Sequence, residues 1–439
     1  MRIAKLLTTT AVFMVLGSTA IATGHQDNPY ATHHELGLMQ GFPPPADRQV
    51  DRSNGLFGVP YNRWSYQNMR TIWPSANIPS PKASMPLKID PDGGIERLAV
   101  PRLDGSIATM DDFLRETFTD AYVVIKGDEI VFERYLNGMH ADQPHQMMSV
   151  TKSFAGLFGL MAVEEGLVSE DDSLTEVIPE FEGAGAFGGD ATFRHVLDMT
   201  ASINFSEDYA DPNSGIQQYG RVLGLLEASA DERVANTIYE YLPMLPKDDA
   251  HEHGEVFHYQ TPKTDVVNWV TNRVTGQSFQ DQLTELMAGI GAKGETYVLL
   301  DRNGTLFAGG GLNATPRNLA RFAVMMLNDG QAGDAQVVPE TVIAALEAGA
   351  SRDAFSNGPN GKKVYGDGNW SYRAQWWVRH TPGREAINAL GIHGQWITID
   401  RKNDIAIIKQ SSDPISSDED IDAYHYNAID AVTDYLTGS

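Results

Sequence analysis

Residues 145–168, HQMMSVTKSFAGLFGLMAVEEGLV, decide how this chain folds. Phe154, Leu157, Phe158 and Met161 recur at the i, i+3, i+4 and i+7 spacing of a helix. Other apolar residues fill the remaining faces. The stretch therefore predicts a helix that is buried on almost every side.

Two polar residues stand near the start of this helix. Ser149 and Lys152 are three residues apart, so a helix would place their side chains on one face. Serine needs a base in reach to act as a nucleophile, and lysine serves as that base when burial or nearby positive charge lowers its pKa. The alternative is a helix cap followed by a surface lysine, because S-x-x-K also arises by chance. The position of the pair, at the opening of a buried helix, favours the nucleophile and its base.

Strand patterns flank the helix at both ends of the chain. Before it, AYVVIKGDEIVFERYL (121–136) predicts a hairpin that turns at Gly127-Asp128. After residue 365 come the β-rich runs YRAQWWV, GQWITID and DIAIIKQSS. Helical patterns dominate between about 170 and 350, and further helices are expected near 110 and at the C-terminus. We therefore expect an α+β fold: one mainly antiparallel sheet, flanked by N- and C-terminal helices, plus a helical lobe.

These patterns divide the chain into four parts. The expected boundaries are a signal peptide (1–22), an irregular arm (23–104), a sheet lobe (105–170 and 362–439) and a mainly helical lobe (171–361). The arm is rich in Pro, Gly and Asn, and its aromatic residues predict that it is wrapped onto the body.

The first residues resemble an export signal. Arg2 and Lys5 precede a short apolar run, and Ala20-Ile21-Ala22 has the small-x-small form of a cleavage site. We predict cleavage after Ala22 and a periplasmic or secreted protein. No later apolar run has the roughly 20 residues that a membrane-spanning helix needs, so we expect no integral membrane segment.

Composition excludes several classes of function. The formal net charge is −25 over 439 residues, which argues against a nucleic-acid partner. The absence of cysteine excludes disulfides, thiolate metal sites and a cysteine nucleophile. HEHGEVFH (251–258) contains three histidines but no H-E-x-x-H, and a solvated loop is favoured over a metal site. Gly309-Gly310-Gly311 lacks the context of a phosphate loop and predicts a close backbone approach near the cleft.

Several motifs together resemble a known group. The hairpin, S-x-x-K, helical lobe, returning strands and terminal helix are similar to the serine β-lactamases and penicillin-binding proteins, class C branch. The sequence within these motifs is more similar to the 6-aminohexanoate-dimer hydrolases, which hydrolyse amide bonds of nylon oligomers. The stretches that carry this resemblance are SVTKSF, HVLDMT, FSEDYADP, FAGGGLNATPRNLARF and GIHGQW. The resemblance covers about residues 105–439.

The resemblance implies a role for each matching residue. Ser149 would be the nucleophile and Lys152 its general base. Tyr259, the first residue of a match to the Y-x-N motif, would relay the proton to the leaving amine. Tyr209 would close over the scissile amide. The amide of Ser149 and one near Gln395 would form the oxyanion hole. The alternatives are a core tyrosine at 259 and an ordinary loop tyrosine at 209.

Two departures from the group's motifs bear on the substrate. Thr261 stands where lactamases have asparagine, and His393-Gly394-Gln395 occupy the region of the K-T-G motif without its lysine. In lactamases these groups hold the carboxylate and side-chain amide of a β-lactam. Their loss favours a linear amide or ester, with Tyr209, Thr261, His393 and Gln395 as the expected substrate-binding residues. A strand histidine is as often a structural hydrogen-bonding group.

The sequence therefore predicts an exported serine hydrolase that cleaves a small-molecule amide or ester through an acyl-enzyme, with no metal and no cofactor. One alternative is a β-lactamase or D-Ala-type peptidase of the same fold. The other is a non-catalytic binding protein that kept the fold. The sequence leaves the natural substrate and the oligomeric state open.

Overall fold

An eight-stranded sheet forms the centre of the protein. The computed structural model describes residues 28–228 and 235–438, so the predicted cleavage site after Ala22 lies outside the described residues. Neighbouring strands are antiparallel except for the parallel pair at one edge. In spatial order the strands are β12 (Trp370–Arg373), β13 (Trp376–Arg379), β14 (Ala386–Gly391), β15 (Gln395–Asp400), β16 (Ile405–Ser411), β5 (Thr119–Lys126), β6 (Glu129–Tyr135) and β2 (Lys88–Ile89).

The two ends of the chain meet at the centre of this sheet. β16 pairs with β5, and Ile408 lies opposite Val123. Side chains alternate across the sheet, so Val123 belongs to the core on one face while its neighbours Tyr122 and Val124 belong to the core on the other. The predicted hairpin turning at Gly127-Asp128 and the predicted antiparallel sheet are both confirmed.

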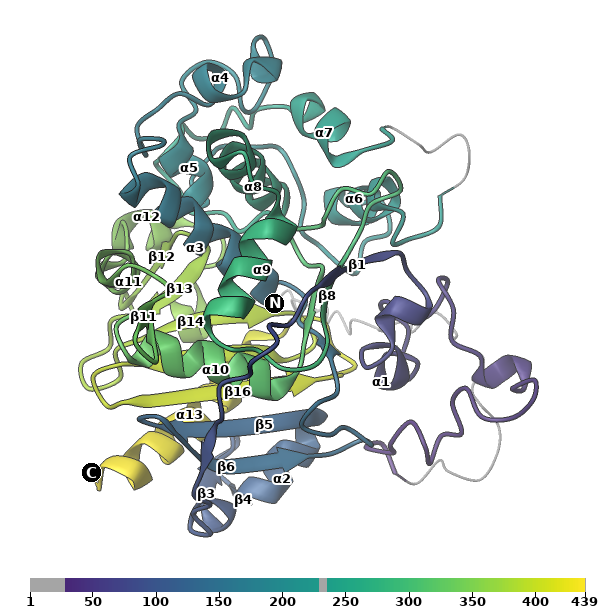
Figure 1. Cartoon of the computed structure of the whole chain (residues 1–439). Helices are drawn as coiled ribbons and strands as arrows, with labels where there is room; N and C mark the ends of the chain where they lie inside the picture. Colours follow the sequence, from purple (N-terminus) through teal and green to yellow (C-terminus); the bar gives the residue numbers. More distant parts are fainter. Residues whose placement is uncertain (1–27, 229–234, 439) are drawn as a thin grey trace, which may run out of the picture.

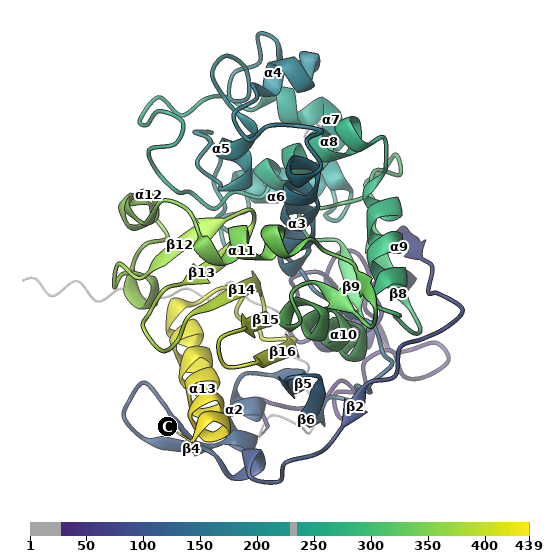
Figure 2. The same ribbon diagram turned by 60° about the vertical axis from the view of Figure 1, so that its left-hand side comes forward.

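Helices cover both faces of the sheet, as Figures 1 and 2 show. One face carries α2 (Met110–Glu116) and α13 (Glu419–Thr437), the two predicted flanking helices. The other carries α3 (Val150–Glu164), α10 (Pro316–Leu327) and α11 (Glu340–Ala348). The predicted α+β architecture, a mainly antiparallel sheet flanked by N- and C-terminal helices, is confirmed.

The helical region lies above the sheet in Figure 1. Its helices are α4 (Leu174–Val177), α5 (Phe193–Leu197), α6 (Gly215–Leu223), α7 (Ile238–Tyr241), α8 (Pro262–Thr275), α9 (Phe279–Gly289) and α12 (Arg352–Asn357). The chain enters this region through α3, which runs between the sheet and α8 (Figure 2).

The burial predicted for the helix at 145–168 is confirmed. Every residue of α3 from Val150 to Leu160 is buried. Gly156 permits the closest approach, because a Cβ there would lie 1.9 Å from the carbonyl oxygen of Ala374. The helix therefore lies directly against the turn between β12 and β13, with no room for a side chain at this point.

A second, smaller sheet lies beside the nucleophile region. Its antiparallel strands, in spatial order, are β1 (Ser75–Ile78), β8 (Thr296–Leu299), β9 (Leu312–Ala314) and β7 (His145–Gln146). The sequence pattern predicted mainly helices around β8 and β9, because strands of three or four residues are too short to show a period. The partners that stabilise β8 and β9 come from the arm and from β7.

The N-terminal arm is held by its buried residues. Tyr66 and Trp73 are buried, as their aromatic character predicted. The Trp73 indole donates to the carbonyl of Leu225 at 3.1 Å, and the Asn62 amide donates to the carbonyl of Ser412 at 3.1 Å. The arm also contains α1 (Asn62–Ser65) and β3 (Ala99–Pro101), the latter pairing with β4 (Ile107–Thr109). A short hairpin, β10 (Gln331–Ala332) and β11 (Ala335–Gln336), follows α10.

In the part of the chain that the structure describes, no helix combines the length and the apolar character that crossing a membrane requires.

Candidate active site

Ser149 and Lys152 meet at the start of α3. Met148, the residue before Ser149, adopts a φ of +47°, which turns the chain from β7 into the helix. The ammonium nitrogen of Lys152 lies 2.9 Å from Ser149 Oγ and 2.5 Å from the carbonyl oxygen of Gly309. Only 7% of Ser149 and 1% of Lys152 are exposed. The structure thus brings together the predicted nucleophile and base in a buried site.

Burial controls the protonation of this lysine. Desolvation lowers the pKa of Lys152 from 10.5 to about 8, because the charged amine loses its water shell. The negative charges of Glu207 and Asp265 act in the opposite direction. A substantial fraction of Lys152 is therefore neutral near pH 8, and a neutral amine can accept the proton of Ser149.

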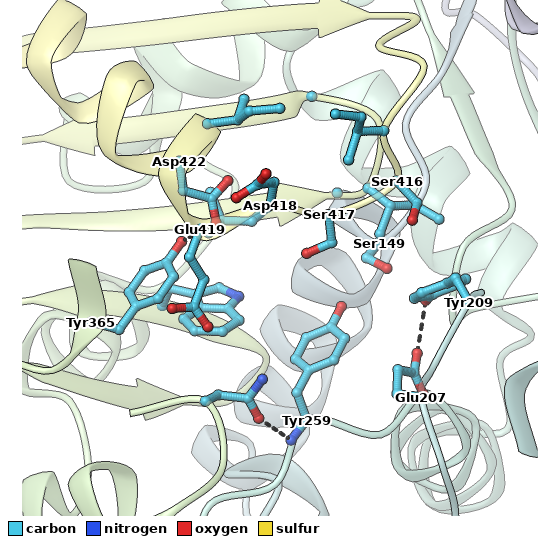
Figure 3. Close-up of a pocket in the computed structure, with 18 of the residues that line it drawn as sticks. Ser149, Glu207, Tyr209, Tyr259, Tyr365, Ser416, Ser417, Asp418, Glu419 and Asp422 are labelled. Atoms are coloured by element: carbon cyan, nitrogen blue, oxygen red, sulfur yellow. Dashed lines mark hydrogen bonds between the residues drawn. The ribbon is translucent and has the colours of Figure 1, made fainter. Parts of the chain in front are cut away.

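Tyr259 faces the same pair from the start of α8. Its ring stacks on Trp377 with centroids 5.7 Å apart, and the Lys152 nitrogen lies 5.2 Å from its centroid. Its backbone amide donates to Asn360 Oδ1 at 3.1 Å. Burial raises the pKa of Tyr259, although a side-chain hydrogen bond with Ser149 acts in the opposite direction. Figure 3 shows its hydroxyl directed towards Ser149.

Glu207 connects two of the expected substrate-binding residues. Its carboxylate accepts from the Tyr209 hydroxyl at 2.8 Å (Figure 3). It also accepts from the Thr261 amide at 3.0 Å and from the Thr261 hydroxyl at 2.5 Å. Tyr209 and Thr261 are thereby fixed to each other beside the nucleophile, from two loops that are 52 residues apart in sequence.

His393 and Gln395 do not reach the space beside Ser149, contrary to expectation. His393 is 2% exposed, its Nδ1 lies 2.7 Å from the carbonyl oxygen of Asp413, and burial lowers its pKa to about 4. The Gln395 side chain is bound to the backbone of Ser411 on both of its polar atoms, at 2.6 and 3.1 Å. The tight turn between β14 and β15, where His393 has a φ of +61°, directs both side chains into the protein.

The residue that approaches the nucleophile from β14 is Gly391. A Cβ at this position would lie 3.1 Å from the amide nitrogen of Ser149 and 2.6 Å from the carbonyl oxygen of Met147. The next residue, Ile392, borders the space on both sides of Ser149. The backbone at Gly391 and Ile392, rather than at Gln395, is therefore the part of the strand that is closest to Ser149.

Two cavities meet at Ser149. The larger, of about 240 Å³, is also lined by Tyr259, Glu207 and the loop before α13. The smaller, of about 50 Å³, is also lined by Lys152 and by apolar side chains. Tyr209 borders both. Ser149 is thus placed where a substrate could extend in two directions.

Sequence reasoning missed Glu207 and Asn360. Glu207 is in FSEDYADP, two residues before Tyr209, but its partner Thr261 is distant in sequence. Asn360 is in a Gly- and Pro-rich loop whose conformation no local pattern specifies. The glycine cluster at 309–311 did predict a close backbone approach near the cleft. The carbonyl oxygen of Gly309 accepts a hydrogen bond from the Lys152 amine.

His253 of HEHGEVFH lies near two potential ligands, with its ring centroid 5.5 Å from that of His195 and its Nε2 3.7 Å from Asp190 Oδ1. His253 Nδ1 accepts from the amide of Ser202 at 2.9 Å. Across residues 28–228 and 235–438, no cluster of three or more His, Asp or Glu side chains could hold a metal ion. No residue set in this part of the chain is therefore assigned to a metal.

Comparisons with known proteins agree with this geometry. A family model described as Beta-lactamase matches residues 108–431. The 6-aminohexanoate-dimer hydrolase of Paenarthrobacter ureafaciens is 33% identical over 375 residues, which are 84% of this chain and 89% of that protein.

Solved structures give the same result. A Bacillus anthracis protein provisionally assigned as a 6-aminohexanoate-dimer hydrolase is 26% identical, with a TM-score of 0.80, covering 90% of this chain and 99% of that one. An octameric penicillin-binding protein homologue from Pyrococcus abyssi, 18% identical, has a TM-score of 0.53 and covers 75% of this chain and 76% of that one. The latter likeness concerns the fold alone. The resemblance to the 6-aminohexanoate-dimer hydrolases is confirmed.

The burial of Lys152 predicts that replacing it stabilises the protein. Its folded pKa of about 8, against 10.5 ordinarily, means that the unfolded chain binds the proton more tightly. Stability therefore rises with pH between those values. At pH 7 the buried charge costs about 3 kcal/mol, and the two lost hydrogen bonds offset about 1 kcal/mol each. We expect Lys152→Met to raise the free energy of unfolding by about 1–2 kcal/mol in urea titrations.

The matched control is Lys402→Met, which changes an exposed lysine and should leave stability within about 0.5 kcal/mol. A Lys152→Met variant that is less stable than the wild type would contradict the buried-charge penalty.

Proposed function

This chain belongs to the beta-lactamase family, and we propose that it is a serine hydrolase that cleaves linear amides or esters through an acyl-enzyme. One observation carries the proposal. The Lys152 amine, buried and with a pKa lowered to about 8, lies 2.9 Å from Ser149 Oγ. A neutral amine at this distance is a general base, and a serine beside it is an activated nucleophile.

Acylation follows from the positions of three side chains. Lys152 takes the proton of Ser149 while Oγ bonds to the carbonyl carbon of the substrate. The resulting tetrahedral oxyanion accepts hydrogen bonds from the backbone. Tyr259 then delivers a proton to the leaving nitrogen or oxygen as the bond to carbon breaks. Its high pKa keeps the hydroxyl protonated for this step, and Lys152 can restore its proton.

The backbone offers two amides for the oxyanion. Ser149 supplies its own amide at the N-terminus of α3, where the helix dipole favours negative charge. The amide of Ile392 is our second candidate, because Gly391 brings this part of β14 against Ser149. It replaces the amide near Gln395 that the resemblance implied. Deacylation uses the same groups in reverse, with water in place of the leaving group.

The cavity favours linear substrates over β-lactams. Among the described residues that line the larger cavity there is no lysine or arginine to hold the carboxylate of a β-lactam. Thr261 is bound to Glu207 and is not free for that role. A relative that is named for hydrolysing the 6-aminohexanoate dimer, a linear amide, supports the same choice.

We propose in addition that the protein is exported after cleavage behind Ala22, on the strength of Ala20-Ile21-Ala22 and the preceding apolar run. N-terminal sequencing of the exported protein should begin at Thr23. Recovery of intact Met1 outside the cytoplasm would overturn this.

Ser149→Ala should abolish turnover while the protein stays folded, because the hydroxyl contributes little to the core. The test uses p-nitrophenyl butyrate, a linear amide and a chromogenic cephalosporin. We expect a burst of p-nitrophenol from the wild type, a loss of at least ~10³-fold in kcat for the variant, and unchanged circular dichroism.

We also expect the cephalosporin to have a kcat/KM at least about tenfold below that of the best linear substrate, because it lacks a charge-assisted partner for its carboxylate. Wild-type rates in Ser149→Ala would refute the mechanism. A cephalosporin preferred by tenfold would show that the site is a lactamase site.

The activity should rise with pH through about 8, because only the neutral Lys152 amine accepts a proton and its pKa is about 8. Glu207→Gln removes a negative charge that raises this pKa, so the rise should move to lower pH. The measurement is kcat/KM for a p-nitrophenyl ester between pH 5 and 10. The control Glu285→Gln, an exposed position on α9, should leave the profile in place. A profile that is flat over this range would exclude Lys152 as the base.

A further inference from the structure

The two cavities that meet at Ser149 differ in chemistry. Apolar side chains dominate the wall of the smaller one, and they include Leu56, Phe57, Ile216, Leu223 and Phe307. No Asp or Glu is among the described residues of that wall, and its one charged group, Lys152, is turned to Ser149 and Gly309. This cavity suits an uncharged aliphatic group.

The larger cavity is strongly acidic. Its wall includes five carboxylates, Glu207, Asp413, Asp418, Glu419 and Asp422, and among its described residues there is no lysine or arginine. Figure 3 shows Asp418, Glu419 and Asp422 gathered with Tyr365 on the side of Tyr259 away from Glu207. We call these three carboxylates the acidic wall. The nearby Lys363 instead pairs at 3.4 Å with Asp420, which is exposed and does not line the cavity.

Two polar atoms in the lining of the larger cavity have no hydrogen-bond partner. His425, 2% exposed and part of the cavity lining, has its Nδ1 2.8 Å from the carbonyl oxygen of Ile421, which leaves Nε2 as an acceptor. This Nε2 has no hydrogen-bond partner, and neither has the buried Oε2 of Glu419. The lining of the larger cavity thus includes two unpaired acceptors, one on His425 and one on Glu419.

Asp422, another member of the acidic wall, is surrounded by carboxylates. Tyr365 donates to Asp422 at 2.9 Å. Burial, followed by the charges of Glu419, Asp418 and Asp413, raises the pKa of Asp422 to about 7. A bound cation would relieve this repulsion and would satisfy the open acceptors. The rings of Trp377 and Trp396 also border this cavity.

The catalytic groups show which half of a substrate enters each cavity. Tyr259, which would protonate the leaving group, lines only the larger cavity, whereas Lys152 lines only the smaller one. The leaving group therefore belongs to the acidic side and the acyl group to the apolar side. We infer that the substrates are amides or esters that join an uncharged aliphatic acyl group to a leaving group carrying an ammonium or other cationic end. This inference rests on the hydrolase activity proposed above.

The inference separates this chain from a simple preference for 6-aminohexanoate oligomers. In the linear dimer of 6-aminohexanoate the acyl half ends in an ammonium group and the leaving half ends in a carboxylate. Both charged ends would then lie in unfavourable surroundings. The ammonium would be buried in the apolar cavity without a carboxylate partner, and the carboxylate would face the acidic wall.

The test compares substrates that differ by one charge. N-(4-aminobutyl)hexanamide has a cationic leaving group, N-pentyl-6-aminohexanamide has a cationic acyl group, and N-pentylhexanamide has neither. For the wild type at pH 7.5 we expect kcat/KM for the first to exceed that of the neutral amide at least tenfold. We expect the second to fall at least tenfold below it. Equal values for the three amides, or the reverse order, would overturn the inference.

Variants locate the effect. Asp422→Asn and Glu419→Gln keep the shape of the acidic wall and remove a charge each, so both should reduce the advantage of the cationic leaving group several-fold, mainly through KM. The neutral amide should lose less than the cationic amide does, so the ratio of the two kcat/KM values is the readout. The matched control is Asp420→Asn, on the same turn of α13 but outside the cavity, which should keep the wild-type ratio. An unchanged ratio in both wall variants would overturn the assignment of the site.

A binding measurement separates failure of this inference from failure of the proposed activity. Calorimetric titration of the wild type with pentylammonium and with pentanoate needs no turnover. We expect the cation to bind, the anion not to bind, and Asp422→Asn to weaken the cation at least tenfold. Binding without turnover would leave the cation site standing and refute the hydrolase. Turnover of the neutral amide without binding of pentylammonium would support the hydrolase and refute the cation site.

Discussion

The interaction on which the site depends is the contact between the buried Lys152 amine and Ser149 Oγ. The amine is held from one side by the serine at 2.9 Å and from the other by the carbonyl of Gly309 at 2.5 Å. It can remain there only if the surrounding protein excludes water, because water would return the lysine to its ordinary pKa. The apolar faces of α3, packed between the sheet and α8, provide that exclusion. The proposed chemistry therefore depends on the hydrophobic core that buries Lys152.

The same constraint explains the rest of the architecture around the site. β7 enters the second sheet just before Ser149, and the amide of Met147 is bound to the carbonyl of Leu312 at 2.9 Å. The hydroxyl of Thr151, one residue before Lys152, accepts from the amide of Leu312 at 3.0 Å. The start of α3 is thus anchored on both sides of the nucleophile. A base that must stay within hydrogen-bond distance of a serine benefits from such rigid support.

Charge is distributed unevenly around this fixed centre. Glu207 lies close enough to raise the pKa of Lys152, and it also holds Tyr209 and Thr261 in place. The acidic wall is on the opposite side of Tyr259 (Figure 3). The net charge of −25 is therefore not spread only over the surface. Part of it lines the cavity beside the nucleophile, where low dielectric makes each carboxylate more effective in selecting a ligand.

The sequence by itself determined the local elements and the residues that carry the chemistry. Local patterns predicted the helix at 145–168, the hairpin at Gly127-Asp128 and the terminal helix. They could do so because helix and strand periods depend on neighbours in sequence. The resemblance of several motifs in order identified the fold and pointed to Ser149, Lys152 and Tyr259, which the structure brings together. Only the tertiary structure decided what surrounds them. It placed His393 and Gln395 away from the cavities, brought Glu207 to Thr261, and completed the short strands β8 and β9 with distant partners. It also divided the space around Ser149 into an apolar and an acidic part. These features arise from contacts between segments that are far apart in the chain, and the direction of a side chain on a tight turn or loop depends on those contacts rather than on a repeating pattern.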